Sequence, residues 1–218
     1  MKNVALGNTV TLSKHTEAAR IALRKTLRHA RKSLASETQH SASTKIAEQL
    51  FLFFSAYFAN IDSHRPINVA SYLVNDGEVN LSSFMTEASK TYSHLHFALP
   101  VLHPVCKGHL LFLNYAANTP LVKNKYNIEE PELACPNIIP SSQLDIILMP
   151  LVGFDAAGNR LGMGGGYYDR TLAFTKHANK KPLLIGIAHD IQEVDSLPIA
   201  PWDIPLNAII TPTRTLSF

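Results

Sequence analysis

Six of the ten glycines of the chain lie within the fourteen residues from Gly153 to Gly166. Glycine accepts positive φ angles and lets other groups approach the backbone, so consecutive glycines can turn several N–H groups toward one anion. The residues that follow, 167–177, have a helical pattern, and the positive N-terminal end of such a helix favours phosphate at the same place. The segment therefore indicates a phosphate-binding loop.

This glycine-rich loop matches neither common nucleotide fingerprint. It contains no GxxxxGK[ST], and its spacing differs from GxGxxG, which argues against a P-loop NTPase and a dinucleotide-binding Rossmann protein. A flexible turn is the alternative, but Arg160 and Asp169 favour phosphate. Asp169 could hold Mg²⁺ between phosphates or balance the dipole of the helix that begins there. The spacing alone leaves these two roles open.

The residues before the loop have the character of a central strand. LDIILMP (144–150) is a continuous apolar run that ends at Pro150, which cannot extend a ladder. Helical candidates at Leu81–Tyr92 and Tyr167–His177 alternate with further β-rich runs, which predicts an α/β fold, a single-domain three-layer α/β/α sandwich with a largely parallel or mixed sheet. These runs are INVASYLV from Ile67, HLHFALP from His94, LLFLNY from Leu110, LLIGIAH from Leu183 and NAIIT from Asn207.

Two helices are expected before the first strand. In the first, Glu17–Leu34, apolar residues recur at helical spacing, and the arginines gather on a second face that could bind a polyanion but is more often only solvated. In the second, Ser36 and Gln39 read as a capping box. The apolar stripes are Leu23, Leu27, Ala30 and Leu34 in the first helix and Ile46, Leu50, Phe53, Phe54 and Tyr57 in the second; the arginines are Arg20, Arg24, Arg28 and Arg31.

Composition places the chain among ordinary globular proteins. It has 218 residues, 46% of them apolar and 17% charged, with a net charge of +3. We expect one domain over residues 15–218 behind a flexible tail at 1–14, a cytoplasmic location, no membrane span and no nucleic-acid partner. The two cysteines predict neither a disulfide framework nor a cysteine-rich zinc site. The sequence leaves a monomer or a weak homo-oligomer open.

Two further segments call for an interpretation. The polar, proline-bearing stretch 115–142 has no strong periodicity and is expected to be a long loop that covers a site. His103, Cys106 and His109 are zinc-ligand types, but a fourth ligand is missing and HPVCKGH has the composition of a loop between strands, so a turn is the preferred interpretation.

The glycine-rich loop resembles the signature of a known family, which implies a substrate for it. The run from Gly153 to Arg170, GFDAAGNRLGMGGGYYDR, resembles the signature of 5-formyltetrahydrofolate cyclo-ligases, also called methenyltetrahydrofolate synthetases. Three weaker likenesses support it and occur in the order that the family has along the chain. They are RxxLR in the first helix, YLVNDGEVN from Tyr72 and LPIAPWDIPLNAIITPT from Leu197. The resemblance implies an ATP- and Mg²⁺-dependent ligase of one-carbon metabolism, which cyclises 5-formyltetrahydrofolate to 5,10-methenyltetrahydrofolate through phosphorylation of the formyl oxygen and attack by N10, releasing ADP and phosphate.

The resemblance also implies roles for individual residues. Arg160 and Tyr167 are expected to be catalytic, and Asp169 and Asp203 to be the magnesium carboxylates. Of the two adjacent tyrosines, we expect at most one, Tyr167, to face the ligand. The expected ATP contacts are Arg20, Arg24, Arg160, Leu161, Gly162, Met163, Gly164, Gly165, Gly166, Tyr167 and Tyr168. The expected folate contacts are Glu78, Met163, Gly164, Gly165, Gly166 and Tyr167, with the length of any polyglutamate chain left open.

One departure from the family pattern concerns charge. Many members read GRGKGYYD, so Met163 and Gly165 stand here where two cations are common. The phosphate is then expected to depend more on Arg160, Arg24 or Arg170. Two alternative functions remain open at this stage: a folate-binding protein that has lost catalysis, and a phosphosugar or coenzyme A enzyme on a similar scaffold. An ATP- and Mg²⁺-dependent turnover assay separates both from the ligase.

Overall fold

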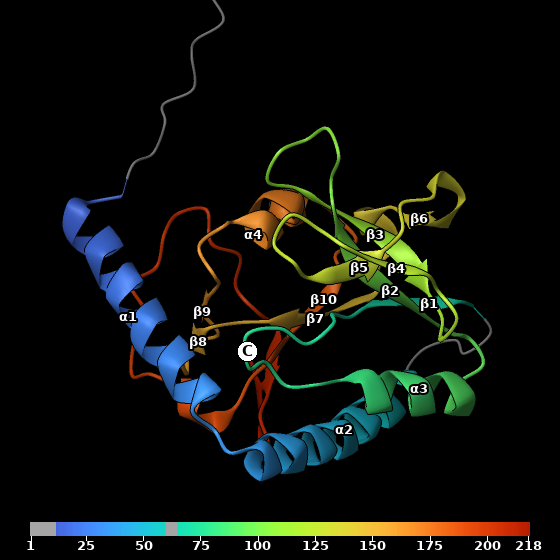
Figure 1. The fold of residues 1–218 in the computed structure, drawn as a ribbon, viewed down its shortest axis with the longest axis horizontal. Helices are drawn as coiled ribbons and strands as arrows, with labels where there is room; N and C mark the ends of the chain where they lie inside the picture. Colours follow the sequence, from blue (N-terminus) through green and yellow to red (C-terminus); the bar gives the residue numbers. More distant parts are fainter. Residues whose placement is uncertain (1–11, 60–64) are drawn as a thin grey trace, which may run out of the picture.

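The computed structural model describes residues 12–59 and 65–218. Two long helices, α1 and α2, precede the first strand, and a third helix, α3, follows it (Figure 1). The helices are α1 (Lys14–Lys32), α2 (Ser36–Phe58), α3 (Ser82–Thr91) and the short α4 (Tyr167–Thr171), with 3₁₀ turns η1 (Cys135–Asn137), η2 (Ser141–Gln143), η3 (Ala173–Lys176) and η4 (Asp190–Gln192).

The described strands form one large mixed sheet and two small hairpins. The large sheet has eight strands in the order β12-β11-β10-β7-β1-β2-β3-β6; its central pairs, from β11 to β2, are parallel and its edge pairs antiparallel. Its strands are β1 (Ile67–Ala70), β2 (Leu95–Leu102), β3 (Leu110–Tyr115), β6 (Ile138–Ile139), β7 (Ile146–Pro150), β10 (Leu183–Ile187), β11 (Ala208–Ile210) and β12 (Thr215–Ser217). The hairpins are β4 (Leu121–Lys123) with β5 (Glu129–Pro131), and β8 (Gly153–Phe154) with β9 (Arg160–Leu161).

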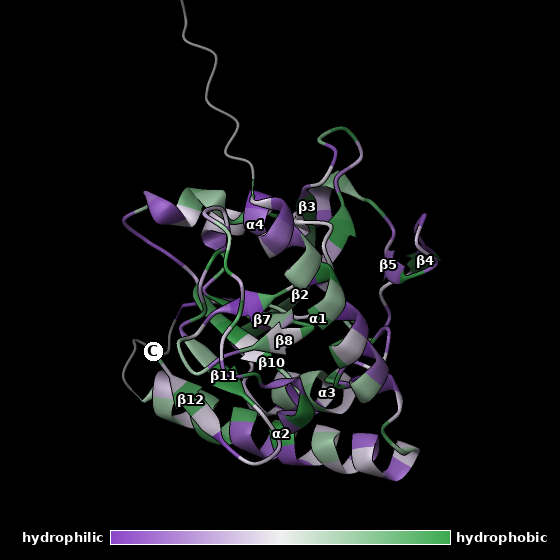
Figure 2. Ribbon diagram, turned by 90° about the vertical axis from the view of Figure 1, so that its left-hand side faces the viewer, coloured by the Kyte–Doolittle hydropathy of each residue, from purple (hydrophilic) through white to green (hydrophobic). Residues whose placement is uncertain are grey.

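Helices cover both faces of this sheet, as the predicted three-layer α/β/α sandwich requires. α2 and α3 pack on one face, where Leu50, Phe54 and Phe84 are fully buried against β1 and β2. On the other face, the residues around α4, among them Leu172, pack against β7 and β10. Figure 2 shows the mixed hydrophilic and hydrophobic residues along α1 and α2 that this one-sided burial requires. The predicted α/β fold and all six predicted strands are confirmed.

The structure corrects three local predictions. The capping box is wrong, because Ser36 is already helical, Ala35 is the N-cap residue, and the Gln39 side chain donates to the Leu34 carbonyl instead. The helix expected over 167–177 ends after five residues at Thr171, and the 3₁₀ turn η3 replaces its second half. The third correction concerns the basic face of α1: Arg31 is fully buried rather than solvated, because it has acceptors inside the protein.

The described chain begins shortly before α1. The expected tail at 1–14 falls mainly on residues 1–11, outside the described residues, and α1 begins at Lys14 behind the Ser13 cap. Within the described ranges, every helix is too short or too polar to cross a membrane.

Candidate active site

A cavity of about 450 Å³ opens at the end of the sheet where β1 and β7 finish. Parallel sheets present their ligand sites at this carboxyl end because the loops that follow the strands converge there. Three parts of the chain surround the cavity: the segment after β1, the glycine-rich loop after β9, and the β4–β5 hairpin. The hairpin belongs to the stretch 115–142 that was expected to be a long loop; this stretch also contains short strands and 3₁₀ turns, and its residues 124–130 contribute to the wall of the cavity.

α1 supports the glycine-rich loop from outside (Figure 1). A Cβ at Gly153 would lie 2.5 Å from Leu27 of α1, so the helix can approach β8 this closely only because residue 153 has no side chain. Arg24, one turn earlier, donates through Nε to the Gly162 carbonyl at 2.9 Å. Its guanidinium also lies beside Gly164, whose φ of +98° suits glycine alone. The helix therefore brings a cation directly onto the loop.

Arg170 lies against the same loop from its other end. Its guanidinium donates to the carbonyl of Gly165 and, at 2.9 Å, to that of Gly108, and it stacks over the Tyr167 ring. Arg24 and Arg170 thus supply positive charge beside a loop that has Met163 and Gly165 where relatives often carry cations. The prediction that distant arginines compensate for these two residues has a structural basis.

The two predicted magnesium carboxylates belong to segments that are in contact, and each carboxylate is held by a buried arginine. Asp169 accepts from Arg160 at 2.5 Å, and its Oδ1 also accepts from the backbone N–H of Ile204, the residue next to Asp203, at 3.3 Å. Asp203 in turn accepts two hydrogen bonds from Arg20, at 2.6 and 3.0 Å. Arg20 and Arg160 are 6% and 5% exposed. Residues separated by more than thirty positions therefore form one charged cluster.

This carboxylate pair suits Mg²⁺, which binds one or two carboxylates together with water and substrate phosphates. Asp169 lines the cavity, and its Oδ2 accepts no hydrogen bond from any described residue. Both oxygens of Asp203 are engaged by Arg20. Asp169 is thus the more available ligand, and Arg20 positions Asp203. Arg160 also has a free donor, because its buried Nε has no partner among the described residues.

Glu78 closes the inner end of the cavity in an environment that disfavours its charge. Burial raises the pKa of its carboxyl from 4.5 to about 7, although the Arg31 guanidinium 3.7 Å away acts in the opposite direction. Arg31 also forms an ion pair with Asp76, at 2.8 Å. Arg28 is hydrogen-bonded to the same Asp76 carboxylate and holds its pKa well below its usual range. Asp76 therefore neutralises most of the buried arginine charge, which leaves Glu78 only partly compensated.

Two tyrosines bridge the glycine-rich loop and the hairpin. The hydroxyl groups of Tyr167 and Tyr126 are hydrogen-bonded at 2.8 Å, and the two rings meet edge to face. Tyr168 lines the same cavity, and burial raises the pKa of its phenol. Both adjacent tyrosines therefore line the cavity, although the sequence favoured Tyr167 alone, and the expectation that at most one of them faces the ligand stays a prediction.

Most of the predicted site residues converge on this one cavity. Glu78 and Tyr167 meet there across about ninety positions of sequence, while Arg24 and Arg20 support the loop and Asp203 from behind. Those lining it are Glu78, Arg160, Gly162, Met163, Gly165, Gly166, Tyr167, Tyr168 and Asp169; those that do not line it are Arg20, Arg24, Leu161, Gly164 and Asp203.

Sequence reasoning missed Tyr126, Asn124 and Arg31 as parts of the site. An aromatic residue in an otherwise polar loop, as in the run KNKYN, was the available signal for the first two. The zinc alternative at 103–109 finds no support: Nδ1 of His103 accepts from the backbone N–H groups of Val105 and Cys106, and the described residues contain no group of three metal-ligand side chains.

Known proteins resemble this chain over most of its length. A sequence model of the 5-formyltetrahydrofolate cyclo-ligase family matches residues 16–212, almost the whole chain. The chain belongs to this family. The 5-formyltetrahydrofolate cyclo-ligase of Escherichia coli strain K12 is 39% identical over 188 residues, which are 86% of this chain and 97% of that protein. The Haemophilus influenzae cyclo-ligase is 37% identical over 86% of this chain and 95% of its own length.

Solved structures of the cyclo-ligase family share the fold. The 5,10-methenyltetrahydrofolate synthetase of Mycoplasma pneumoniae superposes with a TM-score of 0.67 at 25% identity and covers 88% of this chain and 98% of its own. The synthetase of Aquifex aeolicus gives a TM-score of 0.69 at 26% identity, over 91% and 92% of the two chains. The likeness in fold therefore extends over about nine tenths of this chain.

Proposed function

We propose that the cavity between the glycine-rich loop, Glu78 and the β4–β5 hairpin is where this chain converts 5-formyltetrahydrofolate to 5,10-methenyltetrahydrofolate. The observation that carries the location is the convergence, on one cavity of about 450 Å³, of a glycine-rich loop, an arginine–carboxylate pair and a buried carboxyl. A cavity of this size suits one of the two substrates, the folate, whose formyl group would then meet the phosphates on the glycine-rich loop. The glycine-rich loop and the Asp169 carboxylate suit a nucleoside triphosphate with Mg²⁺. The buried carboxyl of Glu78 suits the hydrogen-bond donors of a pterin.

Activation of the formyl group is the chemical problem that the site must solve. A formamide carbonyl is a poor electrophile, and its oxygen is a poor leaving group. Transfer of the γ-phosphoryl group of ATP to that oxygen releases ADP; N10 then attacks the formyl carbon and loses its proton, and the C–O bond breaks with phosphate as the leaving group. The chain must align the formyl oxygen with the γ-phosphate and neutralise charge during the transfer.

The described residues divide this work. Backbone N–H groups of residues 162–166 surround the phosphates, Arg24 and Arg170 supply charge from either side, and the free Nε of Arg160 can donate to a phosphoryl or formyl oxygen. Mg²⁺ held by Asp169 and Asp203 would neutralise further charge on the phosphates. Tyr167 and Tyr126 shield the reacting groups from water, which strengthens every charge interaction inside the cavity.

The folate end of the cavity is proposed to bind the pterin through Glu78. A pterin offers two adjacent N–H donors, and an ionised carboxylate accepts both. Because Glu78 has a pKa of about 7 in the ligand-free protein, binding near neutral pH should release a proton as the carboxylate meets these donors. The inner wall beside Glu78, including Tyr72 and Leu99, is apolar or aromatic and suits the flat ring.

The decisive experiment follows the absorbance of 5,10-methenyltetrahydrofolate when the purified protein meets 5-formyltetrahydrofolate, ATP and Mg²⁺. Asp169→Asn should abolish measurable turnover, and it should also remove the thermal stabilisation that Mg²⁺ with ADP gives the wild-type protein. The amide oxygen of asparagine still accepts from Arg160, so the expected loss of stability is only about 1–3 kcal/mol. Folding is checked by circular dichroism.

Asp195→Asn is the matched control, because Asp195 is an exposed acid elsewhere in the chain. It should keep wild-type turnover and wild-type stabilisation by the nucleotide. A fully active Asp169→Asn protein would refute the metal role of Asp169. Absence of turnover in the wild-type protein, with folate binding intact, would instead favour a folate-binding protein without catalysis.

A further inference from the structure

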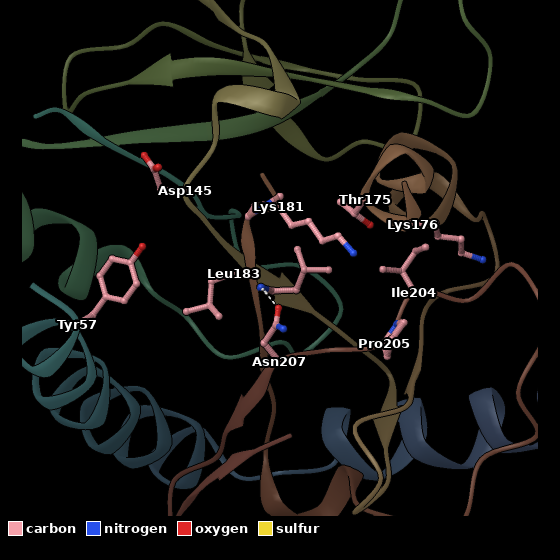
Figure 3. A pocket seen from close by; sticks show the side chains of 11 residues that line it. Tyr57, Asp145, Thr175, Lys176, Lys181, Leu183, Ile204, Pro205 and Asn207 are labelled. Atoms are coloured by element: carbon pink, nitrogen blue, oxygen red, sulfur yellow. Dashed lines mark hydrogen bonds between the residues drawn. The ribbon is translucent and has the colours of Figure 1, made fainter. Parts of the chain in front are cut away.

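A second cavity of about 450 Å³ lies at the opposite end of the sheet, where β7 and β10 begin. It shares no lining residue with the folate cavity. Figure 3 shows its wall, with Leu183 of β10 and Asn207 in the middle, η3 and the 204–205 segment on one side, and Tyr57 of α2 with Asp145 on the other. Nothing in the proposed reaction uses this cavity.

The charge in this second cavity is positive. Asp145, whose side chain is 4% exposed, is already compensated by Arg65 at 2.9 Å and Lys180 at 3.3 Å, and it also accepts from the backbone N–H of Asn68. The two lysines that line the cavity are therefore not needed to neutralise it. Lys176 donates to a neutral acceptor, the Pro201 carbonyl, at 2.8 Å. Lys181 has no hydrogen bond or ion pair with any residue in the described ranges.

The Lys181 side chain extends across the cavity toward Thr175 (Figure 3). The walls around it are apolar or aromatic, formed by Tyr57, Leu183, Ile204 and Pro205. Apolar walls with one or two converging cations are typical of sites for small organic anions, because the walls take the body of the ligand and the cations orient its charge. We propose that the cavity binds a small organic anion, a phosphate or carboxylate on an aromatic or aliphatic group.

Binding of a ligand in this cavity would also affect the active site through the chain segment that both share contacts with. Ile204 lines the cavity, and its backbone N–H donates to Asp169 at 3.3 Å. Lys176 holds the Pro201 carbonyl, two residues before Asp203. An anion that draws Lys176 away from this carbonyl removes one contact from the segment that carries Asp203, while Arg20 continues to hold the carboxylate. The proposal therefore includes a regulatory effect of the bound anion, carried by this segment to the two carboxylates proposed to hold Mg²⁺. This inference extends beyond the proposed function, and the binding step does not depend on it.

Titration of the ¹⁵N-labelled protein with phenyl phosphate tests the binding step. The titration is run with Mg²⁺ and a non-hydrolysable ATP analogue present at saturation, so that the glycine-rich loop is already filled. The amide signals of Thr175, Leu184 and Asn207 should shift together. Inorganic phosphate and phenol, which carry only the charge or only the ring, should each bind at least about tenfold more weakly, because each lacks half of the interactions.

Lys181→Gln should lower the affinity for phenyl phosphate about tenfold, which is the usual consequence of losing one charge-assisted hydrogen bond. Lys90→Gln, an exposed lysine on α3, is the control and should bind like the wild-type protein. Trp202, the single tryptophan, lies between Pro201 and Asp203, so its emission should change with the same half-saturation.

Three results would overturn the proposed site: equal affinity in Lys181→Gln, phenol binding as well as phenyl phosphate, or amide shifts confined to residues 162–166. Tryptophan emission that stays constant while these amides shift would refute the transmission to Asp203. Because the probe needs no turnover, an inactive protein that still binds phenyl phosphate here would disprove the proposed function and leave this site standing.

Discussion

Replacing Glu78 with glutamine should stabilise the ligand-free protein at pH 8 while weakening its binding of folate. Burial raises the pKa of Glu78 from 4.5 to about 7, so the folded protein holds this proton more tightly than the unfolded chain does. Stability from this group is fully present below pH 4.5 and is lost as the pH rises toward 7. Glutamine never ionises, so the substitution removes this loss.

The size of the effect follows from the shift in pKa. A shift of about 2.5 units at 1.36 kcal/mol per unit is about 3 kcal/mol, an upper bound for a carboxyl whose side chain is 11% exposed. Local relaxation reduces it, and we expect Glu78→Gln to raise the free energy of unfolding at pH 8 by about 2 kcal/mol. Arg31 keeps Asp76 as its ionic partner at 2.8 Å, so the substitution leaves no buried charge unpaired.

Urea unfolding of both proteins at pH 5 and pH 8 measures this effect. The midpoint of Glu78→Gln, relative to wild type, should move up by about 1 M between the two pH values. Taking the difference between the two proteins removes contributions from the histidines, which titrate in both. A difference that does not change with pH would refute the raised pKa. The folate arm is separate: KM for 5-formyltetrahydrofolate should rise at least about tenfold, because an amide offers one acceptor and places an N–H against the pterin donors.

Two more substitutions test other parts of the structure. Tyr126→Phe removes the hydroxyl that is hydrogen-bonded to Tyr167 at 2.8 Å, and should raise KM for folate a few-fold with little change in the melting temperature; unchanged kinetics would show that the hairpin does not close the cavity through this bond. Gly186→Ala places a Cβ 2.6 Å from Leu206 and 2.8 Å from Leu151 and should destabilise the protein by about 1–3 kcal/mol in urea unfolding, whereas a neutral result would mean that the sheet relaxes at this point.

Local pattern was enough to predict much of the framework. The continuous apolar run at 144–150 predicted a buried central strand because a parallel strand is covered on both faces and needs no polar alternation, and the β-rich run at 183–189 predicted a further strand. The spacing of Ile46, Leu50 and Phe54 predicted the buried face of α2 for a similar reason. The local sequence pattern gave a wrong prediction where the structure depends on contacts with distant residues. An example is α4, which ends at Thr171 although the helical spacing continues to residue 177.

What the sequence by itself determined about this protein is the α/β framework, the glycine-rich loop after a central strand and, through a long and specific signature, the family. These depend on residues that are neighbours in the chain, so composition and spacing suffice. Only the tertiary structure decided that Arg160 holds Asp169, that Arg20 holds Asp203, and that burial gives Glu78 a pKa of about 7. Charge pairing and desolvation depend on groups that the fold brings together from distant positions, and spacing along the chain carries no record of them.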